Sequence, residues 1–148
     1  MTEINRSIEI AAPPDLVFRE LTDLTRLTRW STITESHDRP DHPLTLDDEF
    51  DQTIRIGGVK LTTHWRCVTY EPPHVVAYEA TAPGGGRLHM RQSIEATATG
   101  SRVDLHADYD LPGGVLGDLL DKVYVERRNE REAEHSLQNL KDLVERPA

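Results

Sequence analysis

Short stretches in which apolar and polar residues alternate follow one another along the chain. In the first of them, Ile4, Ile8 and Ile10 share one side while Asn5 and Ser7 lie on the other. A period of two residues is typical of a half-buried β-strand. The pattern predicts seven strands, over 3–10, 31–36, 49–56, 59–70, 75–81, 87–97 and 102–111. Because most are joined by short turns and are apolar on one face only, they predict an antiparallel sheet.

Helices are predicted in two places, after the first strand and at the end of the sequence. Pro14 suits the first turn of a short helix after the first strand. Thr22 or Asp23 is a good cap for a second short helix that ends near Trp30. A long helix is predicted over 115–145. Since a one-sided sheet must bury its apolar face, the long helix is expected to cover it, which gives an α+β fold in one domain, 1–148.

Charge and composition exclude several partners. The 17 Lys and Arg residues are outnumbered by 26 Asp and Glu residues, a net charge of −9. An acidic chain of this kind is a poor binder of nucleic acid or of an anionic membrane surface. No apolar run is long enough for stable membrane insertion, and the first ten residues do not resemble a signal peptide, so a cytoplasmic location is expected. The mean hydropathy of −0.57 indicates a small core or an interior cavity.

The order of strand, two short helices, six strands and one long helix resembles the helix-grip fold of the START-like superfamily, the polyketide cyclase/dehydrase and lipid-transport type. The resemblance is carried by the segment 8–18, by Trp30, by 71–73 (Glu-Pro-Pro), by Gly100 and by 137–141. It implies a seven-stranded sheet curled around the long helix with a cavity between them. It specifies function poorly, because the superfamily includes carriers, receptors, cyclases and co-chaperones.

Matching the inward faces of neighbouring strands predicts two layers of side chains. The Gly57-Gly58 turn pairs Phe50 with Trp65 and Gln52 with Thr63. Continued across the sheet, one layer reads Phe50, Trp65, Tyr78, Met90 and Tyr109, and the next reads Gln52, Thr63, Ala80, Leu88 and Leu111. The aromatic layer is either a platform for a ligand or ordinary core packing. The inward polar residues Gln52, Thr63 and Gln92 need partners, which a ligand, water or one another can supply.

The long helix carries an unusual stripe. Its apolar positions, Leu120 and Val123 among them, continue on the same side into Arg127 and Glu130. An arginine inside a cavity can hold a carboxylate or polarise a carbonyl. Alternatively, Arg127 pairs with Glu130 at a solvated surface.

No cofactor and no metal are expected. Four residues of metal-ligating types, two histidines and two aspartates, crowd the loop at 37–42, but no spacing matches a metal motif. Cys67 is expected to be a small inward residue without a base to activate it, and the glycines at 84–86 are not a phosphate loop.

The leading hypothesis is a monomer or homodimer that binds a hydrophobic small molecule, such as a lipid, a polyketide-like aromatic or an isoprenoid. Its ligand-binding candidates are Phe50, Gln52, Thr63, Trp65, Tyr78, Met90, Gln92, Tyr109, Leu120, Val123 and Arg127. The first alternative is a polyketide aromatase/cyclase or dehydrase in which Arg127 polarises a carbonyl and Tyr78 or Tyr109 transfers protons. The second is a co-chaperone-like interaction module. The glycine-containing turns at 57–58, 84–86 and 113–114 are expected to meet at the mouth of the cavity.

Overall fold

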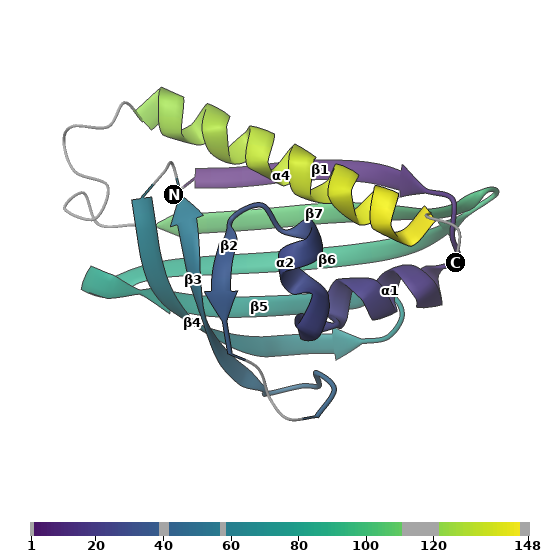
Figure 1. Cartoon of the computed structure of the whole chain (residues 1–148), viewed down its shortest axis with the longest axis horizontal. Helices are drawn as coiled ribbons and strands as arrows, with labels where there is room; N and C mark the ends of the chain where they lie inside the picture. Colours follow the sequence, from purple (N-terminus) through teal and green to yellow (C-terminus); the bar gives the residue numbers. More distant parts are fainter. Residues whose placement is uncertain (1, 39–41, 57–58, 111–121, 146–148) are drawn as a thin grey trace.

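A seven-stranded antiparallel sheet with helices on one side organises the molecule (Figure 1). The computed structural model describes residues 2–38, 42–56, 59–110 and 122–145. The strands follow the order β1-β7-β6-β5-β4-β3-β2. Their bounds are β1 Thr2–Ile10, β2 Thr34–His37, β3 Glu49–Ile56, β4 Val59–Glu71, β5 Val75–Ala82, β6 Gly86–Thr97 and β7 Gly100–Asp110. The α+β helix-grip prediction is therefore confirmed.

Short helices link β1 to β2, and a long helix ends the described chain. The short helices are α1 Pro14–Thr22, η1 Leu24–Arg26 and α2 Leu27–Trp30, and a single turn, η2 Pro83–Gly85, joins β5 to β6. Asp23 caps η1, because its carboxylate accepts a hydrogen bond from the backbone N–H of Thr25. The long helix, α4, spans Lys122–Glu145. The predicted part of this helix at 115–121 lies outside the described residues.

Helix α4 lies along β1 (Figure 1). Polar contacts join it to the middle of that strand and to the residue that follows it. Arg6 donates from Nε to Glu134 at 3.0 Å and from Nη2 to Glu130 at 2.9 Å. Further along, the backbone N–H of Ala11 donates to the Glu145 carboxylate at 2.8 Å. These contacts hold one side of α4 against β1, the edge strand of the sheet, so that another side of the helix faces the interior.

The registers explain which side chains share a layer. The β3–β4 pairs Phe50 with Trp65 and Gln52 with Thr63 are confirmed. Trp65 lies opposite Ala80 instead of Tyr78, because the β4–β5 register places Tyr78 opposite Cys67 and a bulge follows between Cys67 and Thr69.

The register between β6 and β7 was also predicted wrongly. Tyr78 lies opposite Met90 as predicted, but Tyr109 lies opposite Leu88, and Met90 opposite Ala107. The β6–β7 turn is closed by the pair Thr97–Gly100, one residue earlier along the chain than the predicted pairing of Met90 with Tyr109 requires, and this shifts every pair by two.

Gly100 occupies a place where a side chain does not fit. A Cβ atom there would lie 2.2 Å from the backbone oxygen of Ile10 and 2.8 Å from the nitrogen of Ala12. The neighbouring Ser101 is buried and donates from Oγ to the oxygen of Ala12 at 2.7 Å. The close approach therefore joins the start of β7 to the chain between β1 and α1.

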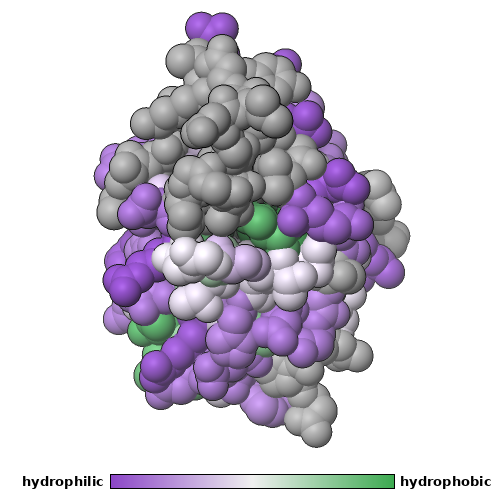
Figure 2. All heavy atoms as spheres, turned by 90° about the vertical axis from the view of Figure 1, so that its left-hand side faces the viewer, coloured by the Kyte–Doolittle hydropathy of each residue, from purple (hydrophilic) through white to green (hydrophobic). Residues whose placement is uncertain are grey.

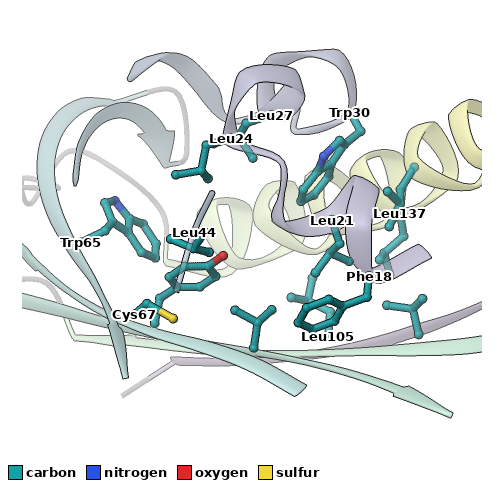
Figure 3. Close-up of a cluster of buried hydrophobic side chains, with 14 of the residues drawn as sticks. Phe18, Leu21, Leu24, Leu27, Trp30, Leu44, Trp65, Cys67, Leu105 and Leu137 are labelled. Atoms are coloured by element: carbon teal, nitrogen blue, oxygen red, sulfur yellow. The ribbon is translucent and has the colours of Figure 1, made fainter. Parts of the chain in front are cut away.

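The core lies between the sheet and the helices (Figure 3). Phe18 and Leu21 of α1, Leu105 of β7 and Leu137 of α4 come together at one end. Leu24 and Leu27 extend the cluster toward the other end, where Trp65 lies (Figure 3). Among the described residues, no helix combines the length and apolar composition that crossing a membrane requires.

Candidate functional site

A cavity of about 120 Å³ lies on the inner face of the sheet. Residues of all seven strands contribute to its lining, and residues of α1, η1, α2 and α4 complete it. Its walls are mostly apolar, so an apolar molecule or group is the occupant that this space favours.

Seven of the predicted site residues line this cavity, and they come from five strands. They are Phe50, Gln52, Trp65, Tyr78, Met90, Gln92 and Tyr109. Thr63 is buried but is not among the lining residues. Leu120 lies outside the described residues; Val123 belongs to α4, but its side chain is not described.

Arg127 does not lie in the cavity, where the apolar positions on the same side of its helix predicted it. It is exposed on α4 and is not among the residues that line the cavity. The helix presents Asn129, Ala133 and Ser136 to the cavity instead. Glu130, the predicted partner of Arg127, accepts a hydrogen bond from Arg6 of β1. The prediction followed apolar positions along the helix, whereas the inward face at this level contains polar Asn129 and Ser136.

Three rings form one wall of the cavity. Phe50 and Trp65 stack with centroids 6.4 Å apart and an interplanar angle of 10°. Tyr78 meets both edge-on, at 5.9 Å from Phe50 and 6.1 Å from Trp65. Edge-to-face and offset contacts of this kind stabilise a fixed arrangement of the rings. The wall is therefore a rigid aromatic surface on which a flat apolar group can lie.

Most polar groups around the rings have partners within the protein. The indole Nε1 of Trp65 donates to Thr63 Oγ1 at 2.7 Å, and Thr63 donates to the backbone oxygen of Gln52 at 2.8 Å. The side-chain oxygen of Gln52 accepts from Thr34 Oγ1 at 2.9 Å. Across the cavity, Asn129 Nδ2 donates to the Tyr109 hydroxyl at 2.7 Å. Gln52 and Thr63 therefore make hydrogen bonds within the protein, which is one of the alternatives that the sequence allowed, the other being a ligand.

Two buried polar atoms of the lining lack any partner among the described residues. They are the indole Nε1 of Trp30 and the side-chain Oε1 of Gln92. A buried polar atom without a hydrogen bond costs free energy, and native proteins have few of them. Two residues of the lining thus hold a donor and an acceptor that no described group satisfies.

Burial also governs the titratable groups beside the rings. It raises the pKa of the Tyr78 phenol, which therefore stays protonated at neutral pH. Burial likewise raises the pKa of the Cys67 thiol to about 11, so little nucleophilic thiolate is present. Cys67 is fully buried, in agreement with its predicted inward position.

Helical residues supply the part of the site that the strand pattern did not reveal. Leu24, Leu27 and Trp30 line the cavity from η1 and α2. Their apolar spacing was visible in the sequence, but nothing there indicated which face of the sheet the short helices would cover. Asn129 and Ser136 carried no sequence signal, because polar residues on a helix are usually solvated.

The expected glycine mouth is only partly described. Gly57, Gly58, Gly113 and Gly114 lie outside the described residues. In η2, Gly84 and Gly85 have φ angles of 78° and 86°, a left-handed conformation that favours glycine. Turn geometry therefore accounts for these two glycines, and the position of the cavity mouth at the glycine-containing turns stays a prediction.

The seven-stranded sheet, the long helix and the apolar cavity between them define a START-like helix-grip protein. The chain belongs to the family described as polyketide cyclase / dehydrase and lipid transport, whose model matches residues 1–145.

Solved structures with the same fold cover nearly the whole chain. The Zhui aromatase/cyclase from Streptomyces sp. R1128 is 21% identical with a TM-score of 0.77, covering 98% of this chain and 94% of that one. Protein CV1439 from Chromobacterium violaceum is 17% identical with a TM-score of 0.75, covering 99% and 100%. Among curated proteins, Toxin Rv0910 from Mycobacterium tuberculosis (strain H37Rv) is 26% identical over 110 residues, 72% of this chain and 76% of its own.

Proposed function

We propose that this protein binds a hydrophobic small molecule in the cavity between its sheet and α4. The supporting observation is an apolar cavity that retains a buried donor on Trp30 and a buried acceptor on Gln92, both without partners among the described residues. The apolar walls provide affinity, and the two polar atoms provide orientation.

The size of the cavity limits what it encloses. Ligand pockets usually measure about 300–1,000 Å³, whereas a cavity of about 150 Å³ accommodates benzene. At about 120 Å³, this cavity matches a single ring or a short branched chain. The ring-sized part of a lipid, polyketide-like aromatic or isoprenoid fits this description, and a larger molecule requires the walls to move.

The second candidate function is an aromatase/cyclase or dehydrase, which the family description includes. Such an enzyme needs a proton donor and a base that reach the substrate. Tyr78 can serve as a donor, but burial raises its pKa and makes it a poor base at neutral pH. Tyr78 therefore does not supply the base, and binding without turnover stays the leading proposal. Recovery of an added ligand unchanged after incubation supports binding, and a new product mass supports the enzyme.

The surface offers little support for a co-chaperone-like module. Among the described residues, the large hydrophobic side chains that are exposed are Leu16 and Leu46, whose exposed fractions are 43% and 51%. The coloured side chains of the face seen in Figure 2 are largely hydrophilic. Docking surfaces usually contain a contiguous apolar patch.

Native mass spectrometry of the freshly purified protein tests the proposal, together with solution binding of toluene and p-cresol. Ala133→Leu adds three carbons to a cavity-lining position of α4 and should abolish binding. Ala96→Leu makes the same change at an exposed position of β6 and should leave binding intact. The proposal is wrong if the protein binds neither probe, or if Ala133→Leu binds them as well as the wild type does.

A further inference from the structure

The amide of Gln92 is buried in the cavity wall with one end unused. The side chain is 4% exposed and lines the cavity. Its Nε2 donates to the sulfur of Met90 at 3.7 Å, while Oε1 has no partner among the described residues. Because a thioether sulfur only accepts hydrogen bonds, the NH₂ side of the amide must face Met90. The oxygen is therefore the free end.

The neighbouring strands explain why this oxygen lacks a donor. Gln92 lies opposite Val76 on β5 and Leu105 on β7, and both of these residues are buried and apolar. Gln52 provides the comparison, since it is a buried glutamine lining the same cavity whose oxygen accepts from Thr34. The fold thus satisfies the oxygen of Gln52 and leaves the oxygen of Gln92, on another lining residue, without a donor among the described residues.

The charges around the cavity favour a neutral partner for this oxygen. The positively charged lining residue Arg55 is exposed, and its guanidinium is bonded to Glu35. Asp108 and Glu132 add negative charge to the lining. A carboxylate would meet an acceptor oxygen and negative charge here, and a buried ammonium would lose its hydration. A neutral hydroxyl carries the required donor without either cost.

We propose that the ligand presents a neutral hydroxyl on a ring-sized group to Gln92 Oε1, an inference that rests on the proposed function of the cavity. Gln92 therefore selects hydroxyl-bearing rings over rings of similar size that have no donor.

Four probes of similar ring size test this selectivity by titration calorimetry or ligand-observed NMR: p-cresol, 4-methylanisole, toluene and p-toluate. We expect p-cresol to bind at least about fivefold more tightly than 4-methylanisole, because the ether leaves the buried acceptor unpaired. Toluene should bind more weakly than p-cresol, and p-toluate should bind most weakly.

Two glutamine variants separate the hydrogen bond from the shape of the cavity. Gln92→Met keeps the length of the side chain but removes the acceptor, so the preference for p-cresol over toluene should fall to about one. Gln52→Met should keep that preference, whatever it does to the affinities themselves, because the Gln52 oxygen already has a donor. Circular dichroism confirms that both variants fold.

The outcomes distinguish this inference from the proposed function. If p-cresol, 4-methylanisole and toluene bind the wild type equally, or if Gln92→Met keeps the preference, the hydroxyl inference is overturned and ligand binding stands. If none of the neutral probes binds the wild type, both proposals are overturned. Tighter binding of p-toluate than of p-cresol would also reject a neutral ligand.

Discussion

Replacing Trp65 by alanine tests the aromatic wall of the cavity. The ring is 2% exposed, stacks on Phe50 and meets Tyr78 edge-on. Removing a buried tryptophan costs about 3–5 kcal/mol. The existing cavity already deprives one side of the ring of contacts, so we expect the lower part of that range, about 3–4 kcal/mol. The loss includes about 0.5–1.5 kcal/mol for each aromatic pair and about 1 kcal/mol for the hydrogen bond to Thr63.

Trp65→Phe is the matched control, because it keeps an aromatic ring and removes the N–H donor. Its expected cost is about 1–2 kcal/mol, the hydrogen bond together with the smaller ring. Urea unfolding followed by circular dichroism measures both variants, provided that the slope of the transition stays constant. A loss below about 1 kcal/mol for Trp65→Ala, or equal losses for the two variants, would show that the ring does not pack as described.

Four further predictions concern other contacts. Arg6→Gln should lower the free energy of unfolding by about 1 kcal/mol, because the side chain loses two carboxylate partners on α4. The control Arg102→Gln removes an exposed ion pair and should change the free energy of unfolding by less than about 0.5 kcal/mol. Urea unfolding measures both variants. Cys67 should react with a thiol reagent near pH 8 roughly 100-fold more slowly than in the urea-unfolded chain, because its raised pKa suppresses the thiolate; equal rates would contradict its burial. Protonated His64 donates hydrogen bonds to Glu49 and Asp51, and these bonds raise the pKa of His64. Their stabilisation should be complete below about pH 6.5 and decline as pH rises through the raised pKa, and His64→Gln should remove this dependence from urea midpoints. Arg127→Leu should leave the affinities for p-cresol and p-toluate unchanged, because Arg127 is exposed and does not line the cavity. Selective loss of p-toluate binding would show instead that Arg127 contacts the ligand.

The sequence by itself determined the elements and the buried faces of the strands. A period of two residues exposes one face to water and buries the other, so Phe50, Gln52, Trp65 and Gln92 were placed inward without any knowledge of their neighbours. A two-residue turn determines a register locally, and the pairing of β3 with β4 was correct for that reason.

Only the tertiary structure decided which inward residues meet. The β4–β5 and β6–β7 registers each differ by two residues from the predicted ones, so most of the predicted layers were wrong although their described residues lie on the predicted faces. The orientation of α4 was decided by its packing in the fold, in which Leu137 and Leu140 are buried and Glu130 and Glu134 pair with Arg6. In this orientation Asn129 lies inside and Arg127 is exposed. Whether a buried oxygen has a donor is decided by side chains from distant segments: Thr34 reaches Gln52, and no described side chain reaches Gln92 Oε1. Hydrogen bonds act over one atomic contact, and such contacts between remote residues exist only after the chain has folded.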